Sequence, residues 1–306
     1  MIVGLVHGGS SSEREVSTLN AQYIEQALRR RGYDTRMIPF DSQVMPTLIR
    51  EKVDFVFLCV QGKGHGDGTL QGMLDFLGIP YTGSGMTTAA LINDKILCKK
   101  LFCFHGHQTP AWSTMRKDVY LSGTFDKSSL PYPFVAKAPT QGGSFGIKMI
   151  RNEADLSLMA DPFRYDDEIL LEAYAPGAFA TVGIWPSPEG MIALPCVEGI
   201  DRRQTTRDGL TLFFGEYTAR PSNLTPETQR RLQDIALEIF NECNARDYAR
   251  IDFIVNEEET RLDVLEINAV PGLKPQSLYP RSAVYADIAY DDLIEGILKS
   301  AVRRIQ

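Results

Sequence analysis

The sequence lacks several features that would place it in whole classes of protein. It has no run approaching the roughly 18 apolar residues that a membrane-spanning helix requires, so we expect no membrane partner. Acidic residues outnumber basic ones by 39 to 32, and the net charge of -7 argues against nucleic acid as the main partner. Internal repeats and low-complexity segments are also absent.

Cysteine is scarce and irregularly spaced. The five cysteines are Cys59, Cys98, Cys103, Cys196 and Cys243, and they do not form the close pairs that zinc sites use. Because their number is odd in a chain of enzyme size, we expect reduced thiols and a cytoplasmic protein. The apolar run at residues 2–6 lacks a basic flank and is too short for a signal peptide.

The chain does contain a regular alternation of short apolar runs and helical patterns, and its 306 residues predict two or three domains. The apolar run at 2–6, a glycine and serine turn, and helical spacing over 13–31 are typical of a doubly wound α/β unit. The almost wholly apolar run at 54–60 predicts a buried parallel strand. A glycine-rich loop follows it at 61–69, where such sheets bind ligands.

A second glycine-rich loop follows a predicted helix at 86–104 and a break at residues 108–110. An apolar strand at 134–137 leads into Lys137, the loop 138–146, and a return strand at 147–150. Backbone amides of such a loop can wrap phosphate oxygens, and Lys137 could neutralise one. The loop lacks the GxxxxGK[ST] pattern and does not lead into a helix, so a phosphate flap and a purely structural turn both remain open.

The remaining predicted elements surround one hairpin. They are strands at 168–174, 179–185 and 191–197, an irregular loop at 206–221, a helix at 226–243 with Thr225 as its N-cap, and a final helix at 291–303.

The hairpin itself carries the strongest cluster of polar groups. Alternation in its two strands puts Arg250 and Asp252 on one face of the first, and Glu266 and Asn268 on one face of the second. If the hairpin folds symmetrically, Asp252 faces Glu266 and Arg250 faces Asn268. Carboxylate and amide oxygens of this kind suit Mg²⁺ held together with substrate phosphates. A solvated polar face is the alternative.

Seven stretches are long or specific enough to compare with known families. They are HGGSSSEREVS (7–17), GDGTLQGMLDFLGIPYTGSG (66–85), NDK (93–95), Lys137 with QGGSFG (141–146), LEAYAPG (171–177), ARIDF (249–253) and LEINAVPGLKPQSLYP (265–280). Together they resemble the D-alanine–D-alanine ligase family of the ATP-grasp superfamily, along essentially the full chain. The resemblance implies an α/β, three-domain ATP-grasp fold with a doubly wound parallel sheet at the N-terminus. We place the domains at residues 1–88, 89–175 and 176–306, with ATP between the second and third.

The resemblance also implies roles for individual residues. Lys95 and Lys137 would hold ATP phosphates, Ser144 would form the flap, and Glu172 would lie at the adenine edge. Asp252, Glu266 and Asn268 would bind two magnesium ions, with Mn²⁺ as a substitute. Arg250 and the amide of Gly272 would stabilise the oxyanion, Glu15 would recognise the ammonium of the first amino acid, and Tyr217 would match a tyrosine of the substrate-closing loop. Ser277 and Leu278 would position the carboxylate of the second amino acid.

The implied activity is ATP-dependent amide formation through an acyl phosphate. That chemistry needs positioning and charge neutralisation, not a nucleophilic side chain. Its product would be D-alanyl-D-alanine for peptidoglycan, and its substrates are small amino acids. A specialised relative that joins other amino acids, or closes a ring in antibiotic or toxin biosynthesis, is an alternative. A nucleotide-binding module without catalysis is another. The family suggests a homodimer.

Several positions depart from the family pattern. Gln61 stands in place of a histidine, Gly66 in place of a glutamate, and Gly143 in place of a flap serine. Phe179 occupies the position of a glutamate near the ribose, and Leu273-Lys274 replaces the usual Met-Thr after the Pro-Gly pair. Lys274 could bind an extra carboxylate or help to deprotonate an amine, or it is a solvated loop lysine. These departures concern the amino-acid substrates more than ATP.

Overall fold

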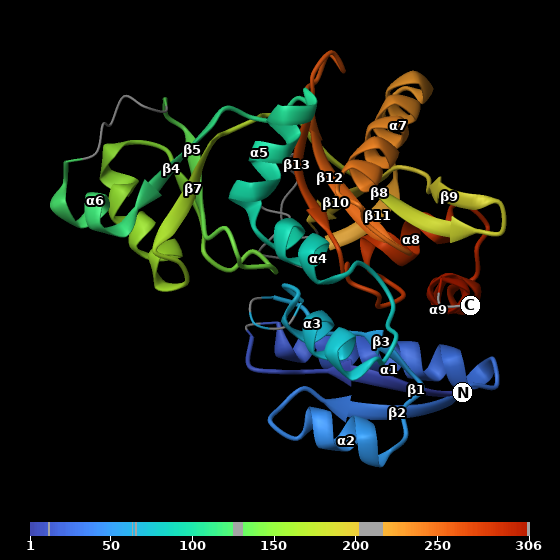
Figure 1. The fold of residues 1–306 in the computed structure, drawn as a ribbon. Helices are drawn as coiled ribbons and strands as arrows, with labels where there is room; N and C mark the ends of the chain where they lie inside the picture. Colours follow the sequence, from blue (N-terminus) through green and yellow to red (C-terminus); the bar gives the residue numbers. More distant parts are fainter. Residues whose placement is uncertain (12, 63, 65, 125–130, 202–216, 305–306) are drawn as a thin grey trace.

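The computed structural model describes residues 1–11, 13–62, 64, 66–124, 131–201 and 217–304. Three sheets organise the chain, in the strand orders β2-β1-β3, β4-β7-β5-β6 and β11-β10-β8-β12-β13, with β9 paired to β8. Figure 1 shows the first sheet below the other two, which lie side by side above it. In the described part of the chain, none of the helices has the length and apolar character needed to cross a membrane.

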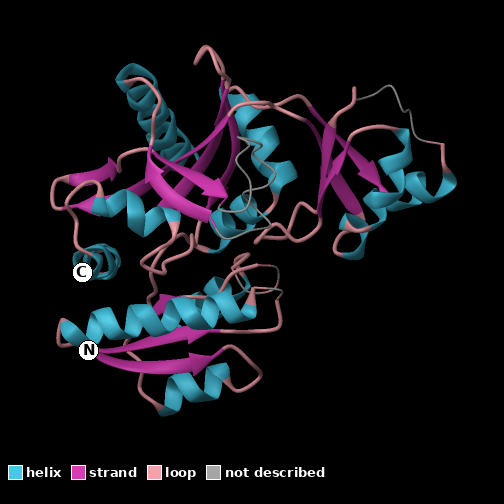
Figure 2. Ribbon diagram, turned by 180° about the vertical axis from the view of Figure 1, so that it is seen from behind, coloured by secondary structure: helices cyan, strands magenta, loops and turns pink. Residues whose placement is uncertain are grey.

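The first sheet confirms the predicted doubly wound N-terminal unit. Its strands β1 (Ile2–His7), β2 (Asp34–Pro39) and β3 (Phe55–Leu58) are parallel. Helices α1 (Arg14–Arg30) and α2 (Val44–Arg50) cover opposite faces of the sheet (Figure 2), and α3 (Thr69–Leu77) follows β3. All four residues of β3 are buried, as its apolar run predicts.

The helical segment after this sheet is broken where the sequence predicts one helix. Asp94 has extended backbone angles, φ −100° and ψ 108°, and separates α4 (Met86–Asn93) from α5 (Lys95–His105). Its carboxylate accepts hydrogen bonds from the backbone N–H groups of Ile96 and Leu97, so it caps α5. Ile92, Cys98 and Phe102 pack in the core of the third sheet, although the predicted boundary at residue 89 assigns them to the central domain.

The central sheet has a core of its own. Its strands are β4 (Trp112–Arg116), β5 (Phe134–Lys137), β6 (Ile147–Ile150) and β7 (Glu168–Ala173), all antiparallel to their neighbours. Helix α6 (Lys117–Ser122) and two short 3₁₀ segments, η1 (Glu153–Ala160) and η2 (Pro162–Arg164), accompany them. The predicted return strand after the glycine-rich loop is therefore present, and Lys137 pairs with Ile147 at the base of that loop.

The third sheet contains the predicted hairpin. Its strands are β8 (Ala178–Ser187), β9 (Gly190–Ala193), β10 (Val197–Asp201), β11 (Tyr217–Pro221), β12 (Ala249–Val255) and β13 (Leu262–Asn268). Helices α7 (Pro226–Glu242), α8 (Leu278–Val284) and α9 (Tyr290–Arg303) complete the unit, and Thr225 caps α7 as predicted.

Parts of this unit differ from the sequence-based predictions. The strand predicted over residues 191–197 is interrupted between β9 and β10. The end of the predicted irregular loop forms β11, while residues 202–216 lie outside the described residues. Helix α8 was not predicted.

The N-terminal and C-terminal units share one core. Val3, Leu5 and Phe57 of the first sheet belong to the same buried cluster as Leu293 and Ile297 of α9. Figure 1 shows α9 close to the first sheet, with the two chain ends on the same side of the molecule. The C-terminal helix therefore covers one of the two buried clusters of the N-terminal sheet, and the other lies within the N-terminal unit.

Candidate active site

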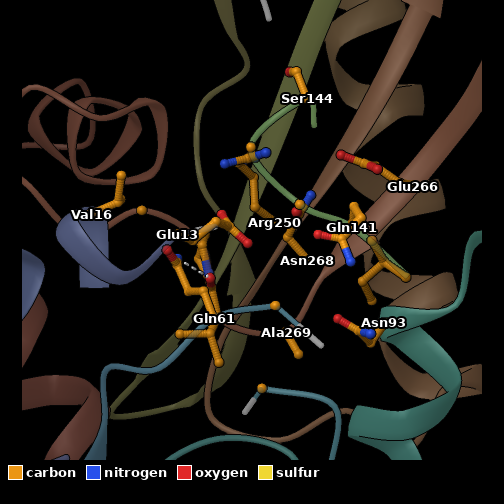
Figure 3. A pocket seen from close by; sticks show the side chains of 18 of the residues that line it. Glu13, Val16, Gln61, Asn93, Gln141, Ser144, Arg250, Glu266, Asn268 and Ala269 are labelled. Atoms are coloured by element: carbon orange, nitrogen blue, oxygen red, sulfur yellow. Dashed lines mark hydrogen bonds between the residues drawn. The ribbon is translucent and has the colours of Figure 1, made fainter. Parts of the chain in front are cut away.

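A cavity of about 360 Å³ opens where the three units meet. Figure 3 shows Glu13 and Gln61 from the N-terminal unit on one side, Glu266 on the other, and Arg250 and Asn268 between them. The glycine-rich loop contributes residues 141–145 to the lining. The cavity therefore gathers residues that are far apart in the sequence.

The hairpin register matches the predicted one at the polar face. Arg250 pairs with Asn268, and Asp252 pairs with Glu266. Between Asp252 and Phe253, on the side nearer the hairpin turn, a β-bulge shifts the register by one residue. Asp252 is completely buried and is held by four hydrogen bonds. Arg250 donates two of them, from Nε at 2.8 Å and Nη2 at 2.7 Å.

The other two hydrogen bonds to Asp252 come from neutral groups. Thr181 Oγ1 on β8 lies 2.5 Å from one carboxylate oxygen, and Asn268 Nδ2 lies 3.1 Å from the other. A buried carboxylate needs such partners to stay charged. The polar face of the hairpin is thus a satisfied, ordered network and not a solvated surface.

Lys95 connects the hairpin to the glycine-rich loop. Its ammonium lies 3.3 Å from Glu266 Oε2 and donates to the carbonyl of Gln141 at 2.7 Å. Burial opposes ionisation of Glu266, but the positive charges of Lys95, Lys137 and Arg250 outweigh it and lower the pKa of that carboxyl group. Lys95 and Arg250 also line the cavity, so a ligand with negative charge, such as a polyphosphate, can meet their positive charges there.

The three predicted magnesium ligands fit unequally. Glu266 and Asn268 line the cavity, and each keeps an oxygen that makes no hydrogen bond described above. Asp252 does not line the cavity, because Arg250 engages both of its oxygens. The donor set is made of hard oxygen atoms, as Mg²⁺ prefers, and with only two carboxylates it depends on substrate phosphates to complete the coordination. Among the described residues, no group of three or more His, Cys, Asp or Glu side chains could hold a metal alone.

The glycine-rich loop closes over the cavity. Ser144 is buried, lines the cavity and adopts a left-handed backbone conformation with φ 66°. Phe145 N donates to the carbonyl of Gly142, and Ala138 N donates to that of Gly146 at 2.8 Å, so the loop is a defined turn. A phosphate flap needs such an arrangement, with backbone amides held in a curve.

The acidic residue that reaches the cavity from the N-terminal unit is Glu13. The predicted ammonium-binding residue, Glu15, is exposed and is not among the residues that line the cavity. A Cβ atom on Gly142 would lie 2.3 Å from Glu13 Oε2, so the glutamate and the flap are in close contact. Burial raises the pKa of Glu13, with Lys95 acting in the opposite direction.

A loop between β13 and α8 forms the floor of the cavity on the other side. Gly272, Lys274, Ser277 and Leu278 all line the cavity, as their predicted roles in substrate binding require. Leu273 N donates to Asn20 Oδ1 of α1 at 3.0 Å, which fixes this loop to the N-terminal unit. Of these residues Ser277 and Leu278 are buried, and Lys274 is half-buried.

A second, smaller cavity lies between the central and third sheets. Lys95, Lys137, Glu172 and Glu266 provide its charged groups, and its other walls are largely apolar. Lys137 Nζ lies 2.8 Å from Glu172 Oε1, and Lys99 Nζ lies 2.8 Å from Glu172 Oε2. The two lysines outweigh the effect of burial and lower the pKa of Glu172. Sequence analysis did not assign a role to Lys99.

Comparisons with known proteins agree with this arrangement. A profile described as the D-ala D-ala ligase C-terminus matches residues 104–299. The D-alanine–D-alanine ligase of Syntrophotalea carbinolica is 33% identical over 99% of this chain and 96% of its own length. The chain belongs to the D-alanine–D-alanine ligase family. Members of this family are ATP-dependent, amide-forming ligases.

Other members of the D-alanine–D-alanine ligase family give the same result. The ligase of Janthinobacterium sp. is 34% identical over 98% of this chain and 95% of its own length. A crystal structure of the Bacillus anthracis ligase complexed with ATP superimposes with a TM-score of 0.84 at 27% identity, covering 99% of this chain and 98% of that one. The predicted family and the ATP-grasp fold are therefore confirmed.

Five of the residues that depart from the family pattern line the first cavity, and the contacts of three of them are informative. Gln61 is buried, donates from Nε2 to the carbonyl of Val270 at 2.6 Å, and lines the cavity. Gly143 has φ 58° and its Cβ position is 3.4 Å from the Glu13 side chain. Phe179 is buried in an apolar cluster with Ile254 and Leu278. The side chain of Tyr217 lies outside the described residues, although its backbone begins β11.

Proposed function

We propose that this ligase uses ATP to join the carboxylate of one small amino acid to the amine of another, with D-alanine as the first candidate for both. The single observation that carries this proposal is the convergence on one cavity of Lys95, Arg250, Glu266, Asn268 and the glycine-rich flap. This set offers cations, hard oxygen ligands and backbone amides to a triphosphate beside an amino-acid site.

Different residues bind different parts of ATP. Lys95, Lys137 and the amides around Ser144 neutralise the phosphates, and Glu172 accepts a hydrogen bond from the adenine base. Glu266 and Asn268 would hold Mg²⁺, which would screen the phosphate charges, and Asp252 as a further ligand stays a prediction. Two such ions, with Mn²⁺ as a substitute, remain a prediction.

The amino acids are held on either side of Arg250. Glu13, and not Glu15, pairs with the ammonium of the first amino acid, because Glu13 lines the cavity. Ser277 and the amide of Leu278 bind the carboxylate of the second. Arg250 and the amide of Gly272 stabilise the oxyanion that forms between them. Tyr217, as part of the loop that closes over the substrates, stays a prediction.

The reaction then follows in two steps. The carboxylate of the first amino acid attacks the γ-phosphorus of ATP and forms an acyl phosphate with release of ADP. The amine of the second attacks the acyl carbon, loses a proton and expels phosphate, which leaves an amide. The protein aligns the reactants and neutralises charge, and a covalent enzyme intermediate is not required.

The changes at Gln61, Gly143 and Lys274 favour a second candidate, a relative specialised for another amino acid or for ring closure. Lys274 is half-buried at the cavity, and its added positive charge suits a substrate with a second carboxylate. A nucleotide-binding module without catalysis is disfavoured because Arg250, Asp252, Glu266 and Asn268 are all retained.

A homodimer and a cytoplasmic location, expected from the family and from the scattered cysteines, stay predictions.

The decisive experiment measures ADP release over a panel of D- and L-amino acids, with mass spectrometry of the products. Stoichiometric D-alanyl-D-alanine from D-alanine and ATP would establish the first candidate and exclude the specialised one. The variant Glu266→Gln is the matched control. It should bind amino acid normally and lose about a hundredfold or more in turnover, since a carboxylate that would hold Mg²⁺ at the phosphates is gone. ATP binding without any amine-dependent ADP release would contradict the proposal.

A further inference from the structure

Lys99 is a completely buried lysine outside the group that lines either cavity. Its ammonium lies 2.8 Å from Glu172 Oε2, donates to Thr109 Oγ1, and donates to the carbonyl of Val264 at 3.2 Å. The contact with Glu172 is an ion pair, and the other two contacts are hydrogen bonds. A charged lysine needs partners of this kind when water is excluded.

The three partners belong to different parts of the fold. Glu172 is on β7 of the central sheet, Val264 is on β13 of the third sheet, and Thr109 is in the segment that connects α5 to β4. Figure 1 shows α5, which carries Lys99, between these two sheets. Lys99 therefore connects the central and third sheets, which form the two walls of the second cavity, without lining that cavity itself.

The link continues to the phosphate-binding end of β13. Thr109 Oγ1 also donates to the carbonyl of Val264, at 2.7 Å, and Val264 N donates to the carbonyl of Gln108 at 2.8 Å. Val264 lies two residues before Glu266 on the same strand, with the β-bulge between them, so Val264 faces the core of the third sheet while Glu266 faces the cavities. A shift at Lys99 would move Glu172 and that strand relative to each other.

The second cavity has the chemistry of a purine site. Val135 and Ile147 from the central sheet face Ile254 and Leu265 from the third sheet, which gives apolar walls for a flat ring. Glu172 is 2% exposed and shares its two oxygens between Lys137 and Lys99. Because Lys137 lines the cavity and Lys99 does not, the oxygen nearer Lys137 faces the ligand. An ionised carboxylate only accepts hydrogen bonds, so it recognises an amino group and not a carbonyl.

We propose that Lys99 is a positioning residue for nucleotide recognition, which holds Glu172 ionised and aimed at the 6-amino group of the purine. This inference rests on the proposed use of ATP. It assigns the adenine preference to a lysine that does not touch the nucleotide. Burial lowers the pKa of Lys99 and the charge of Glu172 opposes that effect, so the two groups support each other's ionised form.

The test compares ATP with purine riboside triphosphate, which lacks the 6-amino group, by titration calorimetry and by amino-acid-dependent turnover. The wild-type protein should prefer ATP. In Lys99→Met this preference should fall by roughly 10- to 100-fold, the usual effect of losing a hydrogen bond to a charged group. The value of kcat at saturating ATP should change less than KM for ATP. Glu172→Gln should lose the same preference, and the double variant should lose no more, because both changes break one interaction.

A merely structural role would give another pattern. Lys99→Met would then lower the melting temperature and leave the ratio of the two nucleotides unchanged, and that result would overturn the inference. Thr109→Val is the matched control, because it removes one partner of Lys99 and leaves the pair with Glu172 intact; it should keep most of the preference. If Lys99→Met does not fold, the ratio is measured in Lys99→Arg, which keeps the charge and alters its geometry; an unchanged ratio there would also refute the role. A wild-type protein that binds neither nucleotide would instead refute the proposed function.

Discussion

Among single residues, Glu13 gives the most direct test of how the first amino acid is bound. Its carboxylate lies beneath the flap, and burial raises its pKa while Lys95 opposes the rise. Only the ionised form can pair with an ammonium, so KM for the first amino acid should rise as the pH falls through this raised pKa. Glu13→Gln should increase that KM by about tenfold or more and remove this pH dependence, since the charge is lost at every pH. Steady-state kinetics over a pH series measures both effects.

The control is Glu15→Gln, the same chemical change two residues further along the chain. Because Glu15 is exposed and does not line the cavity, KM and its pH dependence should match those of the wild type. If Glu15→Gln raised KM and Glu13→Gln did not, the role first predicted for Glu15 would be correct and the assignment to Glu13 would be withdrawn.

These two glutamates also show the limit of prediction for single residues. Arg250, Asp252, Glu266 and Asn268 could be placed together because strands alternate strictly. Glu13 and Glu15 lie where the loop enters α1, and residues two apart on a helix point in nearly opposite directions. The role predicted for Glu15 comes from the family resemblance, and a match by position does not fix the rotation of that first turn. Lys99 was missed for a similar reason, because nothing in a helical lysine indicates that tertiary contacts will bury it.

At the scale of elements, the break at Asp94 sets the position of Lys95. Asp94 caps α5 through hydrogen bonds to Ile96 N at 2.8 Å and Leu97 N at 3.1 Å, and Lys95 is the first residue of that helix. Asp94→Ala should lower the free energy of unfolding by about 1 kcal/mol, the usual effect of losing an N-cap. It should also weaken ATP binding, because the first turn that holds Lys95 beside Glu266 frays. Chemical denaturation and calorimetry measure the two effects.

Asp94→Asn is the matched variant, because an asparagine oxygen can cap the helix without a charge. It should retain most of the stability and most of the ATP affinity. A loss in Asp94→Asn as large as that in Asp94→Ala would mean that the negative charge of Asp94, and not the cap, places Lys95.

The elements that could be predicted are those with a strong local pattern. The hairpin β12–β13, the parallel strands of the first sheet and α7 with its Thr225 cap follow from alternation, apolar runs and capping chemistry. The interruption between β9 and β10 contains Pro195, which lacks a backbone N–H and therefore favours a break in the strand. Helix α8 has seven residues and includes Pro280, and it forms because Leu278 and Tyr279 are buried in tertiary contacts. A short helix of that kind gives little periodic signal.

In the molecule as a whole, the three sheets do not correspond to three independent cores. The first sheet shares one of its two buried clusters with α9 and keeps the other within the N-terminal unit. Helices α4 and α5 share the core of the third sheet, whereas the central sheet is packed around its own cluster. Ion pairs such as Arg30 with Asp291 also join α1 to α9. The sequence predicts the three units in order, but it does not show which of them pack on a common core, because such contacts join residues about 290 positions apart.

Two core variants should show which of these units unfold together. Leu298→Ala on α9 and Ile150→Ala on β6 each remove a completely buried side chain, and each should lower stability by about 2–5 kcal/mol. Leu298 belongs to the core shared with the first sheet, and Ile150 belongs to the central core. Hydrogen exchange in Leu298→Ala should therefore accelerate in β1, β3 and α9 together and stay unchanged in β5 and β7.

Ile150→Ala should produce the opposite pattern, with faster exchange confined to β4–β7, because its cavity opens only the central cluster. Each variant thus serves as the control for the other. ATP would bind between the central and third sheets, so saturating nucleotide should slow exchange in both and reduce the difference between the variants. If β1 stayed protected while α9 exchanged freely in Leu298→Ala, the N-terminal sheet would be stable without the C-terminal helix, and the shared core would not act as one cooperative unit.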